Sequence, residues 1–192
     1  MPRTREQFSE MKDERKASIL GAALPLFATS EKVSIDAICE KAKCSHGIIY
    51  HYFKNTKQIL ETLLKSSTCI ELKQKLFSFD GGSTYEKIEQ IISTLLDVSP
   101  KQLDVVSYLY MIIKERGKES LYNLLYKLLH DGQIGGSIVA GEPSELTDSI
   151  FLMLKGIYLS FLLEKHPNIK VPSVETVMQL LRKPTNFGRQ TL

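Results

Sequence analysis

Four neighbouring positions in this chain could make contacts to a nucleic acid. His46, Tyr50 and His51 carry imidazole or phenol groups, and Gly47 stands among them without a side chain. Such donors and acceptors near a helix N-terminus suit contacts to phosphates and base edges. Glycine also lets the backbone approach another surface closely. These residues predict a helix that enters a major groove, although a tyrosine-rich surface also occurs in ordinary helical bundles.

The surrounding segment, residues 34–57, has the pattern of a helix, a tight turn, a second short helix and the start of a third. Ser34 is a good N-cap, and apolar residues then recur at helical spacing over residues 35–42. A second helix over residues 45–53 follows, and Asn55 can cap the next one. Two short helices joined by a turn of about three residues form a helix-turn-helix.

The expected contacts divide into two groups. Base-edge contacts are expected from His46, Gly47 and His51. Hydroxyl and lysine side chains around the helix ends are expected to hold phosphates, because helix dipoles and lysine charge both favour an anion there. These phosphate candidates are Ser34, Ser45, Tyr50, Lys54, Thr56 and Lys57.

The same segment resembles the DNA-binding half of TetR-type (TetR/AcrR-like) transcriptional regulators over about residues 10–65. The resemblance is carried by Ile19-Leu20, Ala22-Ala23, Leu26-Phe27, Asp36-Ala37-Ile38, Ala42, Cys44-Ser45, Gly47, Ile49-Tyr50 and Tyr52-Phe53-Lys54-Asn55. It implies an all-α fold, with an N-terminal three-helix bundle that contains the helix-turn-helix and a C-terminal helical domain for ligand binding and dimerisation. It also implies a DNA-binding transcriptional regulator, most often a repressor that a ligand releases.

Three features depart from the pattern of that family. The link from Phe27 to Ile35 looks shorter than usual and lacks a glycine, and Thr56 stands where a lysine is usual, with Lys57 next. These two departures concern phosphate contacts at the edges of the site. Pro25 lies inside the first predicted helix, residues 11–28, where it removes a backbone hydrogen bond and predicts a kink or a locally opened turn.

Composition and charge fit a folded DNA-binding protein. Hydrophobic residues make up 43% and charged residues 24% of the chain, which is ordinary for a globular protein. Residues 1–57 hold ten basic and seven acidic residues, whereas the remainder holds fifteen of each. The whole net charge of +3 therefore lies in the segment that would face phosphates.

Enzymatic and metal-binding functions are not expected. The chain contains no G-x-S-x-G, H-E-x-x-H, P-loop or dinucleotide fingerprint, so we expect no enzyme and no cofactor. A zinc site of Cys39, Cys44, His46 and His51 can be imagined. However, the two cysteines fall on apolar positions of the helical pattern, where cysteine behaves as a small hydrophobe, and the histidines face the other way.

The sequence also predicts where the protein works. Three cysteines give no disulfide framework, and the N-terminus carries no secretory signal, so a cytoplasmic protein is expected. The longest apolar run, residues 150–163, is too short for a bilayer, which needs roughly 20 residues. No membrane association is therefore expected.

We expect a DNA-binding domain over residues 1–56 and an effector-binding and dimerisation domain over residues 57–192. One continuous helix from about residue 55 to residue 77 is expected to connect them. Five further helices are predicted over residues 84–98, 100–116, 119–129, 144–165 and 173–183, with a glycine-rich loop at 131–143. Residues 1–10 and the tail 185–192 are expected to be mobile.

The helix over residues 144–165 is apolar on nearly every face and must be buried on nearly every face. The simplest arrangement buries one side in its own core and the other against a second copy, with the helix over 173–183 alongside. The resemblance implies the same homodimer. A central helix of a monomer is the alternative. Two recognition helices related by a twofold axis could read a palindrome, with their half-sites roughly 34–36 Å apart.

The effector stays unknown from the sequence. Aromatic and sulfur-containing side chains could line its pocket or belong to the core: Tyr108, Tyr110, Met111, Tyr122, Tyr126 and Met153. The scarcity of charge in the apolar helices hints at an apolar ligand. The rival function is an all-helical dimeric protein-interaction module that does not bind DNA.

Overall fold

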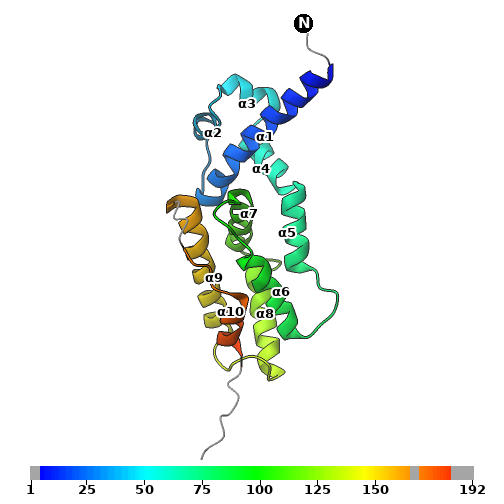
Figure 1. Ribbon diagram of the computed structural model, residues 1–192, viewed down its shortest axis with the longest axis vertical. Coiled ribbons are helices and arrows are strands. Elements are labelled where there is room, and N and C mark those ends of the chain that lie inside the picture. Colours follow the sequence, from blue (N-terminus) through cyan, green and yellow to red (C-terminus); the bar gives the residue numbers. More distant parts are fainter. Residues whose placement is uncertain (1–4, 165–168, 183–192) are drawn as a thin grey trace, which may run out of the picture.

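A computed structural model describes residues 5–164 and 169–182, and these residues are helical almost throughout (Figure 1). In chain order the helices are α1 (Arg5–Thr29), α2 (Ile35–Ala42), α3 (His46–Tyr52), α4 (Thr56–Leu64), α5 (Ser67–Phe77), α6 (Thr84–Leu96), α7 (Leu103–Lys114), α8 (Leu121–Ile134), α9 (Pro143–Leu159), the π-helix η1 (Ser160–Glu164) and α10 (Val174–Leu181). Within the described residues, extended pairing is limited to one isolated bridge, Ile138 to Arg182. The predicted all-α fold is confirmed.

The molecule is elongated, with α1 to α4 at one end and α5 to α10 filling the rest (Figure 1). At the first end, α1 packs against α2 and α4 around the fully buried Ile19, Ile38 and Ile59. In the larger part, α7, α8 and α9 pack on one another and α6 packs on α8. Helix α1 also packs against α7, so it contacts both parts of the molecule. The predicted boundary between residues 56 and 57 stays a prediction.

Helix α1 is longer than its apolar stripe predicts. It begins at Arg5, so the expected mobile leader is wrong for residues 5–10, while residues 1–4 lie outside the described chain. A kink or a locally opened turn was predicted at Pro25. The helix runs through Pro25 without a break, so the opened turn is wrong, and the kink stays a prediction. The carbonyl of Gly21, which Pro25 cannot bond, belongs to an exposed residue where water can reach it. The Thr29 hydroxyl donates to the Pro25 carbonyl at 2.8 Å.

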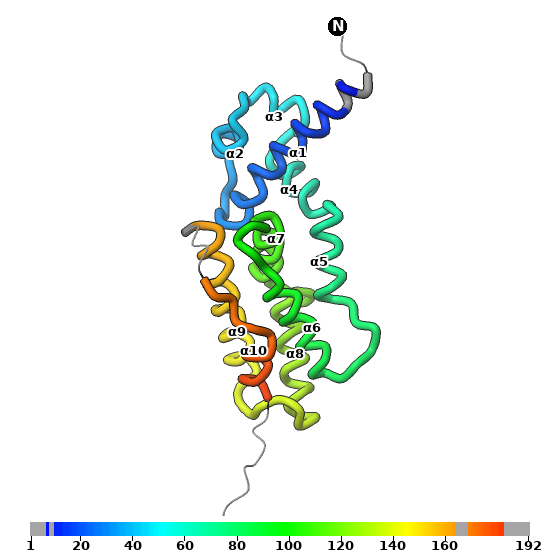
Figure 2. Tube along the Cα trace, viewed as in Figure 1, coloured from blue at the N-terminus to red at the C-terminus, as the bar shows by residue number. Residues whose placement is uncertain are grey.

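The continuous helix predicted over residues 55–77 is wrong, because the chain breaks at Lys65 and Ser66 (Figure 2). The Ser66 hydroxyl accepts a hydrogen bond from the Cys69 backbone N–H at 3.2 Å, which makes it the N-cap of α5. The same hydroxyl donates to the Tyr108 phenol on α7 at 2.9 Å. A serine that caps a new helix competes with continuation of the old one. Helices α4 and α5 therefore meet at a joint that is fastened to α7.

Helix α7 begins three residues later than its proline predicts. Pro100 was expected in its first turn, but it lies in a turn closed by the Gln102 backbone N–H, which donates to the Ser99 carbonyl at 2.9 Å. Proline favours the second position of such a turn because its φ is already set there. The helix then starts at Leu103.

Helix α8 continues into the segment that was predicted as a loop. Its end lies at Ile134, beyond the expected residue 129, and Gly132 is part of the helix. A Cβ at Gly132 would come 2.5 Å from Cγ1 of Ile138, which is itself buried. The glycine is therefore needed for close packing of the following chain and does not mark a loop.

Helix α9 starts at Pro143 rather than Ser144, with Glu142 as its cap residue, and continues into η1. The segment Pro143–Leu163 is long and apolar enough to cross a membrane by length and composition, which the 14-residue apolar run alone did not indicate. One of its faces is nevertheless packed into the protein core, as in the core helix of a soluble protein. That face carries Ile150, Phe151, Leu154, Ile157, Tyr158 and Phe161.

We predict that Ser66→Ala lowers the free energy of unfolding by about 1–3 kcal/mol, because it removes both a helix cap and a part-buried hydrogen bond. Urea denaturation of the purified protein measures this. Ser67→Ala is the matched control, since Ser67 is exposed in the first turn of α5, and it should change stability by less than about 0.5 kcal/mol. Equal effects of the two substitutions would contradict the role given to Ser66.

Candidate nucleic-acid interface

The turn between α2 and α3 is fixed by backbone hydrogen bonds. Lys43 ends α2 in the left-handed conformation, with φ 49° and ψ 53°, and its N–H donates to the Glu40 carbonyl at 3.3 Å. The next N–H, from Cys44, reaches back to the Cys39 carbonyl at 3.0 Å. This is the Schellman arrangement, in which the side chains before and after the turn contact each other. The turn therefore holds α3 at a set angle to α2 without a glycine.

Helix α3 is anchored through one side. Ile49 and the following Phe53 are buried, whereas Ile48 and Tyr52 are half-buried. The Ser34 hydroxyl caps α2 by accepting from the Ala37 N–H at 3.1 Å. Ser45 begins α3, but its hydroxyl makes no cap hydrogen bond and stays available to a ligand.

The two cysteines of this unit behave as packing residues. Cys39 is buried and Cys44 is half-buried, and burial, together with the neighbouring Cys44 thiol, raises the pKa of the Cys39 thiol. A protonated thiol is a poor metal ligand. Among the residues that the structure describes, no three His, Cys, Asp or Glu side chains gather as a metal site requires.

The residues predicted to contact DNA lie outside the core. All but Thr56, which is half-buried, are exposed: Ser34, Ser45, His46, Gly47, Tyr50, His51, Lys54 and Lys57. Lys54, Thr56 and Lys57 follow α3 at the start of α4, where the Asn55 side chain accepts from the Gln58 N–H at 2.9 Å. The structure thus brings the predicted set to α3 and the adjoining ends of α2 and α4.

A polar side-chain contact joins the first turns of α2 and α3. Nε2 of His46 lies 2.8 Å from Oδ1 of Asp36. The contact places the N-terminus of α2, and so Ser34, beside the N-terminus of α3. The contact also occupies one imidazole nitrogen of His46, a residue predicted to contact base edges. The sequence did not indicate this contact. Lys57 makes a longer contact of 3.9 Å to Glu61 on its own helix.

The structure itself does not require glycine at position 47. Gly47 has ordinary helical geometry, and a Cβ built there would meet only the Ser45 hydroxyl oxygen, at 3.9 Å. Glycine in a helix lowers stability relative to alanine. A surface outside the chain that comes close to this backbone would account for its presence.

Arg15 is a candidate residue that the sequence reading did not select. A cavity of about 480 Å³ between α1 and α3 is lined by Arg15, Ser45, Gly47, Ile48, His51 and Tyr52. Arg15 is half-buried, although the α1 residues around it are exposed. Its spacing in the sequence could have indicated it. Arg15 stands four residues before the core residue Ile19 and therefore lies on the same face of the helix.

Residues 19–63 match the model of the family described as "Bacterial regulatory proteins, tetR family". Over 161 residues the chain is 24% identical to the HTH-type transcriptional repressor KstR of Mycolicibacterium smegmatis, covering 81% of this chain and 78% of that repressor. The DNA-binding segment of this chain, residues 19–63, is therefore similar to that of TetR-type transcriptional regulators. Its match begins at Ile19 and spans α2, α3 and most of α4.

Solved structures share the fold of this chain over most of its length. The fatty acid degradation regulator FadR from Bacillus halodurans is 17% identical, with 86% of this chain and 93% of that chain covered and a TM-score of 0.52. The protein of the SmeT–triclosan complex is 15% identical, with 93% and 96% covered and a TM-score of 0.52.

We predict opposite effects of Gly47→Ala on stability and on DNA binding. The free energy of unfolding should rise by about 0.5–1 kcal/mol, because alanine favours an exposed helix. DNA affinity should fall by about tenfold or more, because the new methyl group stands where DNA approaches the backbone. Urea denaturation and fluorescence anisotropy with labelled operator DNA measure the two effects. Gly21→Ala, at an open and exposed helical position on α1, should leave DNA affinity unchanged. A stabilised Gly47→Ala variant with full DNA affinity would exclude the close approach.

Proposed function

We propose that this TetR-type regulator is a ligand-responsive repressor that binds a palindromic operator as a homodimer, with α3 as the recognition helix. The observation that carries the proposal is the division of α3 into two sides. Ile49 is fully buried, while the polar side chains of the same helix face solvent. A helix anchored through Ile49 and the adjacent Phe53, with Ile48 and Tyr52 half-buried beside them, leaves its polar face available to DNA.

The proposed contacts follow from the chemistry of the exposed groups. His46, Gly47 and His51 face base edges, and Arg15 joins them from α1 at the edge of the same cavity. Phosphates are held by Ser34, Ser45, Tyr50, Lys54, Thr56 and Lys57. The Asp36 carboxylate holds His46 in place through its 2.8 Å contact. The protein acts in the cytoplasm, where it reaches DNA.

The proposed dimer uses α9, η1 and α10, the elements expected over residues 144–165 and 173–183. Residue 165 and residue 183 lie outside the described chain. Leu152 on α9, Leu163 on η1 and Leu180 on α10 are 68%, 61% and 71% exposed. Large apolar side chains exposed on each of the last helices favour an interface, because water solvates them poorly. A second copy would cover them and set two α3 helices for successive major grooves.

The interaction-module alternative predicts no salt-dependent retention on DNA. Binding to the DNA that flanks the gene of this protein, measured over a salt series, separates the two functions. We predict sequence-selective binding whose affinity falls steeply with salt, because released counterions drive it. Tyr50→Ala should weaken it. Absence of binding to any fragment at low salt would favour the interaction module.

Arg15→Ala should reduce the slope of log affinity against log salt by about 1, as expected when one phosphate contact is lost, or relax base preference if Arg15 reads a base. Lys118→Ala is the control, because Lys118 is exposed on the loop before α8. It should leave both the slope and the preference unchanged. An Arg15→Ala variant that behaves like the control would remove Arg15 from the interface.

Leu152→Glu should convert the dimer to a monomer, because a buried carboxylate without a partner costs several kcal/mol. Sedimentation velocity at micromolar protein measures the change, and operator affinity should fall in parallel. Ile134→Glu is the matched control, since Ile134 is a 76% exposed apolar residue at the end of α8. A Leu152→Glu variant that stays dimeric would place the interface elsewhere.

A further inference from the structure

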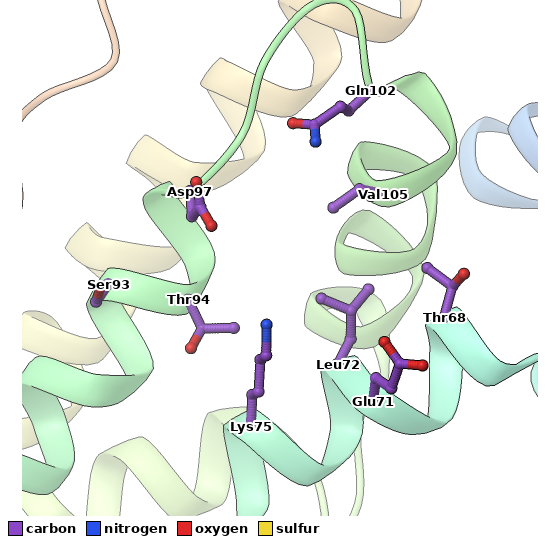
Figure 3. Close-up of a pocket in the computed structure, with 9 residues that line it drawn as sticks. All are labelled: Thr68, Glu71, Leu72, Lys75, Ser93, Thr94, Asp97, Gln102 and Val105. Carbon is purple, nitrogen blue, oxygen red and sulfur yellow. The ribbon is translucent and has the colours of Figure 1, made fainter.

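A polar cleft opens on the side of the larger domain, between α5, α6 and the start of α7 (Figure 3). Its volume is about 340 Å³, which lies in the range of small-molecule sites. Leu72 and Val105 provide its apolar wall. Its polar lining consists of Thr68, Glu71, Lys75, Ser93, Thr94, Asp97 and Gln102.

The charged groups of this cleft are not paired with one another. Glu71 and Lys75 are four residues apart on α5, yet neither they nor Asp97 form an ion pair within 4.0 Å with any described residue. Gln102 stands at the N-cap of α7 without a side-chain cap hydrogen bond. Figure 3 shows the Lys75 amine pointing into the space between α5 and α6, with the Asp97 carboxylate and the Gln102 amide turned toward the same space.

We propose that this cleft binds a small zwitterion with a cationic side group, such as a basic amino acid, and that the ligand acts on the joint between α4 and α5. The Lys75 amine would hold the ligand carboxylate. The Asp97 and Glu71 carboxylates would hold its cationic groups, and Leu72 with Val105 would cover its methylene chain. A lining with two carboxylates and one amine favours a ligand that carries more positive than negative groups. The regulatory part of this inference rests on the proposed repressor function.

The position of the cleft explains how occupancy would reach the DNA-binding end. Ser66 caps α5 and donates to Tyr108 on α7, so one hydrogen bond fastens the two helices that flank the cleft. Val105, which lines the cleft, lies one turn from Tyr108 on the same face of α7. A ligand wedged between these helices would strain the bond from Ser66 and shift the start of α5.

A shift of α5 would move α4, because only Lys65 and Ser66 separate the two helices. Ile59 and Leu63 of α4 are buried, and α4 packs against α1. The helix-turn-helix would then change its position relative to its copy in the dimer. Such coupling requires that the ligand bind the two arrangements with different affinity. The ligand would bind the arrangement with the wider cleft more tightly and so lower DNA affinity.

Isothermal titration of the full-length protein tests the site without DNA. The probes are L-arginine and L-lysine, with agmatine as the probe that lacks the carboxylate. L-arginine should bind about tenfold more tightly than agmatine, because one charge-assisted contact is lost. Lys75→Ala should bring L-arginine down to the affinity of agmatine and leave agmatine unchanged. Asp97→Asn should weaken both, and Lys127→Ala, an exposed lysine on α8, should change neither.

Two results would overturn the site. The first is no heat from L-arginine or L-lysine at about 10 mM, a concentration at which even millimolar affinity is detected. The second is equal L-arginine binding by the wild type and by Lys75→Ala. Thermal melting of each variant without ligand checks that these exposed substitutions leave the fold intact.

The coupling is tested by operator binding with and without L-arginine. Saturating ligand should lower the DNA affinity of the wild type by about fivefold or more, and Lys75→Ala should need about tenfold more ligand for the same effect. Ligand binding without any change in DNA affinity would overturn the coupling and retain the site. A protein that binds L-arginine but no DNA under any condition would instead overturn the proposed repressor function, so the two failures are distinguishable.

Discussion

The position of the recognition helix depends on how α1 is held, because α1 packs against α2 and α4 on one side and against α7 on the other. At its C-terminal end, the Lys114 amine of α7 donates to the Ala28 carbonyl at 2.8 Å. A lysine at this end also complements the partial negative charge of the helix terminus. The DNA-binding end is therefore attached to the larger domain at two places, here and at the joint between α4 and α5. The ligand proposed for the polar cleft would act on one attachment while the other serves as the pivot.

Local sequence patterns correctly predicted the elements whose structure depends on residues that are close together in the chain. The apolar spacing and the serine caps predict α2 and α3 to within a residue, and exposure of the contact residues follows from that periodicity. The break at Ser66 could not be predicted in this way, because its partner Tyr108 lies 42 residues away. Gly132 was misread for the same reason, since only the packing of Ile138 shows why a glycine stands inside a helix.

The sequence pattern likewise identified only part of the candidate DNA-binding site. The pattern of residues 45–57 supplied the helix and its polar face, whereas Asp36 and Arg15 belong to it through tertiary contacts with α3. The aromatic residues considered for an effector pocket are divided between core and surface. Tyr108 and Tyr110 are buried, and Met111 lines a cavity between the two domains with Phe27, Leu60 and Leu64. Polar groups that face a cleft without partners were the stronger indication of ligand chemistry, and they become visible only when α5, α6 and α7 are assembled.

For the proposed repressor, the joint at Ser66 has a consequence for how tightly a promoter is silenced when no ligand is present. In an unbroken connecting helix, the stiffness of the backbone would keep the unliganded protein in one arrangement. Here the hydrogen bond from the Ser66 hydroxyl to the Tyr108 phenol contributes to the balance between the two arrangements, and such a bond contributes about 1 kcal/mol. A change of that size alters a two-state population by roughly fivefold. Background transcription from the operator would therefore be adjustable through substitutions at Ser66 or Tyr108, without any change in the residues that read DNA.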